Sequence, residues 1–116
     1  MDECRLGSQL VNILAGIFKI NFMATQKNTS YGLSAENPIL MRSIPETYSY
    51  LHSLCFLRPG LSFKRQRSLF SLNFNHPIDY YLFYLNDNHF ADIYVYSYHK
   101  ENILSIPAPF IVERLN

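Results

Sequence analysis

The sequence predicts an α+β fold in which one capped helix packs on a three- to four-stranded antiparallel sheet. Three observations support this prediction. A helix-start motif precedes apolar residues at helical spacing, two strand-like segments are joined by a short polar loop, and 48% of the 116 residues are hydrophobic. A chain of this length can build one compact core but is too short for two ordinary domains.

The N-terminal region has two interpretations. Its apolar run, residues 10–18, falls at helical spacing and predicts an amphipathic helix within residues 1–22. The run is shorter than the about 20 residues that cross a bilayer, and acidic residues precede it, so we expect neither a transmembrane segment nor a signal peptide, and a cytoplasmic protein. In the second interpretation, translation starts at Met23 and residues 1–22 are a gene-model extension. The polar stretch 23–37 predicts a flexible linker before a single α+β domain at 38–116.

The clearest local signal predicts a helix over residues 44–56. Ser43 and Glu46 have the spacing of a capping box, in which the serine hydroxyl accepts from a backbone N–H and the glutamate reaches back to the serine N–H. Pro45 suits the first turn, and Arg58-Pro59-Gly60 ends the helix. The expected buried face consists of Ile44, Tyr48, Leu51 and Cys55, with Leu54 beside it.

Beyond the helix, alternating apolar and polar residues predict strands. Residues 39–41 form a short strand or extended segment, residues 61–70 a strand, and residues 71–77 a loop. Residues 78–85 and 90–98 are the strongest strands, and we expect a four-residue hairpin loop, Asn86-Asp87-Asn88-His89, between them. Two prolines restrict the segment 103–112 to an edge strand or an extended tail.

The hairpin also carries an aromatic surface. The chain has nine Phe and nine Tyr, and pairing Leu85 with Phe90 would place an aliphatic face against the helix and an aromatic face opposite. That face predicts a non-enzymatic protein–protein or self-association module. Its candidate interaction residues are Tyr81, Phe83, Phe90, Tyr94, Tyr96 and Tyr98. In an alternative interpretation, the N-terminal helix or the segment 103–112 covers this face as a second core layer.

A basic strand supplies an alternative function. Strand alternation places Lys64 on one face and Arg65 with Arg67 on the other, which predicts a two-arginine site for a small ligand or anion. An exposed edge strand protected by charge is the competing interpretation. The formal net charge of only +1 argues against a nucleic-acid partner.

Catalytic and cofactor motifs are absent from the sequence. Neither a phosphate loop, a dinucleotide fingerprint nor a serine-nucleophile motif occurs, so we expect no cofactor, no metal and no catalytic residue. His52 lies three positions from Cys55, but the pair lacks the other groups of a working site, which makes a small hydrolase or transferase a distant third hypothesis. Cys4 and Cys55 are expected to be reduced thiols.

From residue 37 onward, a series of framework motifs follows a recognisable order. They are Asn37-Pro38-Ile39-Leu40-Met41, Tyr50-Leu51-x-x-Leu54, the strand Lys64 to Ser68, Ile78-Asp79-x-Tyr81, Ile93-Tyr94-Val95-Tyr96 with Tyr98-His99, and Pro107 to Phe110. In these motifs about two thirds of the chain resembles a family of short bacterial proteins of unknown function.

This chain departs from the family pattern in one strand, where Arg65-Gln66-Arg67-Ser68-Leu69 stands in place of Tyr-Glu-Arg followed by an apolar residue and Gly. Some proteins of this appearance are labelled 2-dehydro-3-deoxyphosphooctonate aldolase. That activity requires a (β/α)₈ barrel of roughly 250 residues, for which this chain is too short.

Overall fold

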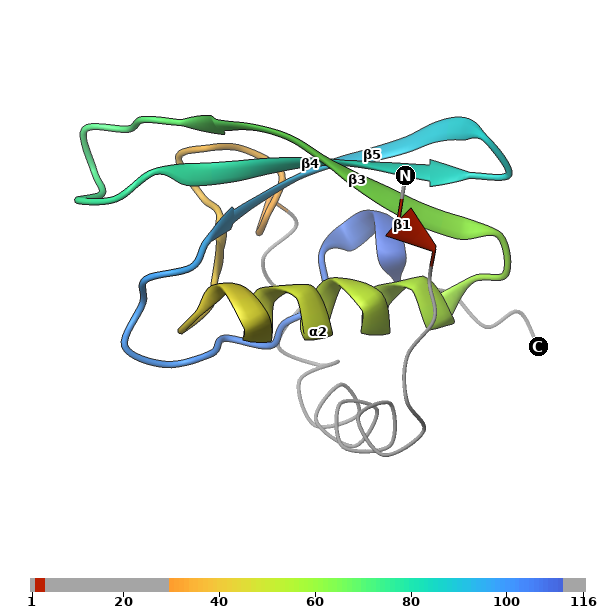
Figure 1. Cartoon of the computed structure of the whole chain (residues 1–116), viewed down its shortest axis with the longest axis horizontal. Coiled ribbons are helices and arrows are strands. Elements are labelled where there is room, and N and C mark those ends of the chain that lie inside the picture. Colours follow the sequence, from red (N-terminus) through yellow and green to blue (C-terminus); the bar gives the residue numbers. More distant parts are fainter. Residues whose placement is uncertain (1, 4–29, 112–116) are drawn as a thin grey trace.

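The computed structural model describes residues 2–3 and 30–111, and it confirms the α+β class (Figure 1). The sheet has the strand order β1-β3-β4-β5-β2 and is antiparallel except where β2 pairs with β5. Its elements are β1 (Asp2–Glu3), β2 (Ile39–Leu40), α2 (Ile44–Leu54), η1 (Cys55–Leu57), β3 (Leu61–Leu69), β4 (Ile78–Leu85), β5 (Asn88–Tyr96) and η2 (Ala108–Phe110). Most of residues 1–22, with the helix or extension expected there, lie outside the described residues.

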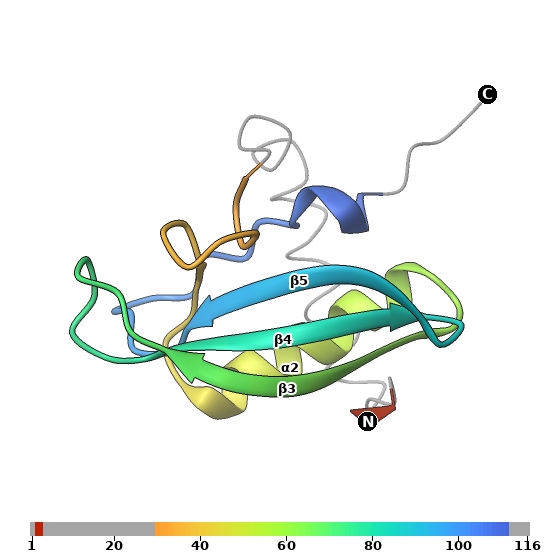
Figure 2. The same cartoon turned by 90° about the horizontal axis from the view of Figure 1, so that it is seen from above.

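The sheet has two unlike sides. The helix α2 lies along one of them, which we call the inner face (Figure 1). Figure 2 views the other side, the outer face, and no described segment crosses in front of β3, β4 and β5 there. The two faces therefore differ in what covers them.

The predicted helix is confirmed, and its start is a variant of the expected capping box. The Glu46 backbone N–H donates to Ser43 Oγ at 3.3 Å, as predicted. The Glu46 carboxylate accepts from the Ser43 hydroxyl itself at 3.0 Å, and it also binds the guanidinium of Arg42. After η1, Gly60 takes a φ of +88°, which turns the chain into β3.

The buried side of α2 is rotated from the expected one. Ile44 is 44% exposed, whereas Thr47 and Tyr50 are fully buried together with the expected Leu51 and Leu54. Partners from the chain after β5 explain this difference. Thr47 Oγ1 hydrogen-bonds Ser97 Oγ at 2.7 Å, and the Tyr50 hydroxyl donates to the Ser105 carbonyl, so both polar groups are satisfied in the interior.

The predicted hairpin exists, but its loop and its register are wrong. The turn has two residues, Asn86 and Asp87, with φ values of +50° and +68°, and Leu85 pairs with Asn88 rather than Phe90. A bulge beside the turn then shifts the alternation. As a result, Tyr81 pairs with Ile93 and lies on the inner face, the reverse of the predicted arrangement.

Two segments pack beside β5 and β2, at one side of the sheet. Residues 30–37, assigned above to the flexible linker, form a turn in which Gly32 O accepts from Tyr94 N at 2.8 Å and Tyr31 is buried. The linker prediction is therefore wrong for these residues, while 23–29 lie outside the described part of the chain. The segment 103–111 has no regular secondary structure except η2, and it adds Leu104, Ile106 and Phe110 to the core.

The main core lies between α2 and the inner face. It is formed by buried apolar side chains from α2, from the three long strands and from both edge segments. Within the part of the chain that the structure describes, no helix is long and apolar enough to cross a membrane.

Candidate functional site

The side chains that could bind a ligand or a partner lie on both faces of the sheet, because β3 contains a bulge. Arg65 pairs with Tyr81, and Arg67 pairs with the adjacent Tyr80, so Gln66 is the extra residue. Neighbouring residues of β4 point to opposite faces, and Arg65 and Arg67 therefore do so too. The predicted two-arginine site on one face is wrong, since strand alternation holds only in an unbroken ladder.

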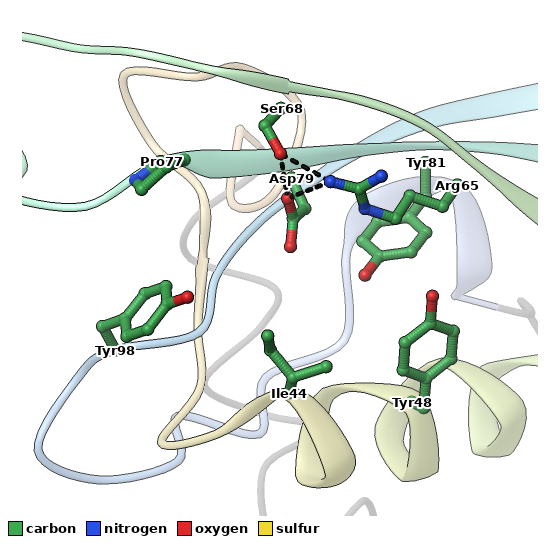
Figure 3. A pocket seen from close by; sticks show the side chains of 8 residues that line it. All are labelled: Ile44, Tyr48, Arg65, Ser68, Pro77, Asp79, Tyr81 and Tyr98. Atoms are coloured by element: carbon green, nitrogen blue, oxygen red, sulfur yellow. Dashed lines mark hydrogen bonds and ion pairs between the residues drawn. The ribbon is translucent and has the colours of Figure 1, made fainter.

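On the inner face, Arg65 belongs to a pocket of about 250 Å³ beside the first turns of α2 (Figure 3). The guanidinium donates through Nη2 to Asp79 Oδ1 at 3.2 Å and to Ser68 Oγ at 2.6 Å. The Ser68 hydroxyl donates to the same carboxylate oxygen at 2.7 Å. The pocket is lined by Ile44, Tyr48, Arg65, Ser68, Pro77, Asp79, Tyr81 and Tyr98.

The hydroxyl of Tyr81 is the most unusual group in this pocket. Tyr81 is fully buried, and its Oη has no hydrogen-bond partner among the described residues. The Tyr48 hydroxyl points from α2 toward the same space (Figure 3) and is near enough to interact with the Tyr81 hydroxyl, although the pair does not reach ordinary hydrogen-bond geometry. Burial, followed by the influence of Tyr48 and Asp79, raises the pKa of Tyr81, so this hydroxyl stays protonated and able to donate.

On the outer face, Arg67 begins a row of stacked groups. Its Cζ lies 5.8 Å from the centroid of the Tyr80 ring, and the Tyr80 and Tyr94 rings stack at 4.9 Å. The Tyr80 hydroxyl donates to Asp92 Oδ1 at 2.9 Å, and His89 Nε2 lies 2.9 Å from the same oxygen. Burial, and then the bond to Asp92, raises the pKa of Tyr80 to about 12, so the hydroxyl remains a donor at neutral pH.

A second row on the outer face runs straight across three strands. Lys64 of β3 pairs with Leu82 of β4, and Leu82 pairs with Asp92 of β5. The row thus reads cation, apolar group, anion. Lys64 is exposed and forms no ion pair within the described residues, while Leu82 is half-buried. The seven residues that characterise the outer face are Lys64, Arg67, Tyr80, Leu82, Tyr84, Asp92 and Tyr94.

The six predicted interaction residues do not form one surface. Tyr81 and Phe83 are sealed in the core, and Phe90 packs against Phe110 at 5.2 Å. Tyr96 is 8% exposed beneath Phe74 of the 71–77 loop. Of the six, Tyr94 lies on the outer face and Tyr98 lines the pocket.

The sequence reasoning missed Tyr80, Leu82 and Tyr84, which occupy the outer face in place of the buried aromatics. One local signal carries part of this information. Asn86-Asp87 suits a tight turn with two positive φ values, and that turn moves the pairing by two residues, which leaves the faces unchanged. The bulge between Phe83 and Tyr84 then shifts the register by one residue and exchanges the faces.

Two further groups of side chains bear on the chemistry expected from the sequence. Cys55 is disulfide-bonded, so the expected reduced thiol is wrong for this residue; the other cysteine of the sequence, Cys4, lies outside the described residues. No group of three or more metal-binding side chains occurs within residues 2–3 and 30–111.

Comparisons with protein-family models, with curated proteins and with solved structures find no match for this chain. The resemblance to short bacterial proteins therefore stays a prediction.

Proposed function

We propose that this protein is a non-enzymatic self-association module that forms a twofold dimer through the outer face of its sheet. The supporting observation is the row Lys64, Leu82 and Asp92, because its charge pattern is complementary to itself. The proposed association surface is thus still Tyr-rich, but it lies on the face of the sheet opposite to the one that contains Tyr81.

The complementarity follows from simple geometry. Let two outer faces meet with the twofold axis between them and nearly parallel to β4, so that it bisects the small angle between the two β4 strands. The axis then places β3 of one copy over β5 of the other, so Lys64 faces Asp92 of the second copy and Leu82 faces its own equivalent. Two sheets packed face to face are about 10 Å apart, and their strand directions differ by about 30°. Residues in a row near the axis therefore stay opposite their partners, while rows farther along the strands move apart.

The neighbouring aromatic row fits the same contact. Tyr80, Tyr84 and Tyr94 are half-buried in the single chain and flank the central Leu82. Tyrosine rings give a large contact area at a low cost in side-chain entropy. Arg67, stacked on Tyr80, would lie opposite Tyr94 of the second copy, where a cation can contact an aromatic ring.

A charge-exchange experiment tests the proposed dimer. Sedimentation equilibrium over a concentration series should give a dimer for the wild type. Lys64→Glu and Asp92→Lys should each weaken the dimer, by about tenfold, because each change creates two like-charge contacts across the axis. An equimolar mixture of the two variants should form a heterodimer, since both contacts between the unlike chains are then attractive.

Lys100→Glu is the matched control, because it makes the same charge change at an exposed lysine in the turn after β5. Near-UV circular dichroism would establish that each variant is folded. A wild type that is monomeric at all concentrations would overturn the proposal, and the outer face would then have to bind a different partner. Equal dimer strength in the Lys64 and Lys100 variants would overturn it as well.

A further inference from the structure

The inner-face pocket is built for a small polar molecule. At about 250 Å³ it is smaller than the roughly 300–1,000 Å³ of sites that hold drug-sized ligands and cofactors. Ile44, Pro77 and Tyr98 line one part of the pocket, and Arg65, Ser68 and Asp79 of β3 and β4 line another (Figure 3). This division suits a ligand with a polar end and a modest apolar end.

The polar part of the pocket presents both signs of charge. Arg65 uses Nη2 for its bonds to Ser68 and Asp79, which leaves the hydrogens on Nε and Nη1 without an acceptor in the described part of the chain. Asp79 accepts through Oδ1 alone, so Oδ2 has no donor there. Each member of the ion pair therefore keeps an unused hydrogen-bonding edge.

The buried hydroxyl of Tyr81 points to a missing partner. An unsatisfied buried donor costs about 1–3 kcal/mol, and native proteins leave few such groups. Tyr81, Tyr48 and Arg65 all line the pocket, and the Tyr81 hydroxyl is directed toward this space from just beneath the pocket surface (Figure 3). A ligand oxygen in this space would accept from Tyr81 and from the guanidinium together.

From these groups we infer that the pocket binds a small zwitterion, of which a free amino acid is the simplest example. The ligand carboxylate would lie at Arg65 and Tyr81, and its ammonium group at Asp79 Oδ2. A simple anion fits less well, because Asp79 already neutralises Arg65 and would repel a second negative charge. A zwitterion leaves the charge of the pocket balanced.

The test begins with the intact chain and a set of the common L-amino acids. Each is titrated at millimolar concentration into ¹⁵N-labelled protein, and amide shifts are followed at Tyr48, Ser68 and Asp79. The best binder is then compared with its deaminated acid and its decarboxylated amine, and we expect both to bind at least tenfold more weakly. Absence of binding by every amino acid overturns the inference, as does an acid that binds as well as its amino acid.

Two variants separate a ligand-binding role from a structural one. Tyr81→Phe removes the buried hydroxyl, so the free protein should keep or gain thermal stability while affinity falls by roughly tenfold. Asp79→Asn should weaken binding of the amino acid more than binding of its deaminated acid. Lys100→Gln, at an exposed residue that does not line the pocket, is the control and should bind as the wild type does.

A Tyr81→Phe variant that is less stable but binds with unchanged affinity would contradict the inference. The pocket opens on the inner face, so neither its success nor its failure depends on the proposed dimer.

Discussion

Arg65 and Arg67 stand two positions apart in β3 and point to opposite faces of the sheet. Arg65 Nη2 lies 3.2 Å from Asp79 Oδ1 on the inner face, and Arg67 Cζ lies 5.8 Å from the Tyr80 ring centroid on the outer face. The bulge at Gln66 produces this separation. One strand thereby supplies a cation both to the proposed ligand pocket and to the proposed dimer surface.

The two arginines should contribute unequally to stability. Arg65→Gln leaves Asp79, which is 9% exposed, without its cation, and we expect a loss of about 1–2 kcal/mol in the free energy of unfolding. The expected loss is modest because the Arg65 side chain is 46% exposed and its charge is screened by solvent. Arg67→Gln should cost less than about 0.5 kcal/mol in a monomeric sample. Urea unfolding at low protein concentration measures both, and equal losses would contradict the assignment of the two faces.

The hairpin turn gives a second prediction. Asp87 has a φ of +68°, a region that glycine adopts without strain, so Asp87→Gly should raise the free energy of unfolding by about 0.5–1 kcal/mol. Asp87→Ala should lower it by a similar amount, since alanine lacks the local hydrogen bonding that lets Asp tolerate this region. Thermal unfolding of both variants checks whether the change in stability is positive for Asp87→Gly and negative for Asp87→Ala. If the loop had the four residues expected from the sequence, the two changes would not differ in this way.

The positions of the elements were predictable from the sequence, and the faces of the strands were not. The capping box at Ser43 and the period-two patterns locate α2, β3 and β4 because these signals are local. The bulge at Gln66 adds one residue, and one residue is enough to exchange the two faces of a strand.

Contacts between residues far apart in the sequence could not be predicted from local patterns either. Tyr50 could be assigned to the core only with knowledge that the Ser105 carbonyl would accept from its hydroxyl, 55 residues further along the chain. The same reason explains why the aromatic face was misplaced. Tyr81 and Phe83 are covered by α2 and by Phe110 of η2, and neither contact is visible in the pattern of β4 alone.

The observed rotation of α2 can be checked by truncating one residue on each side. Leu51 is fully buried, so Leu51→Ala should lower the free energy of unfolding by about 2–5 kcal/mol. Ile44 is 44% exposed, and Ile44→Ala should cost less than about 1 kcal/mol. Chemical denaturation followed by far-UV circular dichroism measures both values. Comparable losses would support the face expected from the sequence instead of the observed one.

The start of α2 makes stability depend on acid pH. Hydrogen bonds from Arg42 and then from Asn102 lower the pKa of Glu46 from the ordinary 4.5 to about 2. A carboxyl whose pKa is lowered on folding stabilises the protein fully above its unfolded pKa, and this stabilisation is lost as the pH falls from 4.5 toward 2.

Glu46→Gln should therefore cost about 0.5–1 kcal/mol at neutral pH, a modest value because the side chain is partly exposed. The difference between variant and wild type should shrink below pH 4.5 and be nearly gone at about pH 2. Unfolding free energies measured across this pH range provide the check. Glu101→Gln removes the same charge from an exposed residue without an ion pair in the described part of the chain, and it should cost less than about 0.5 kcal/mol at neutral pH. A Glu46→Gln deficit that stays constant down to pH 2 would show that the carboxylate charge contributes nothing to the cap.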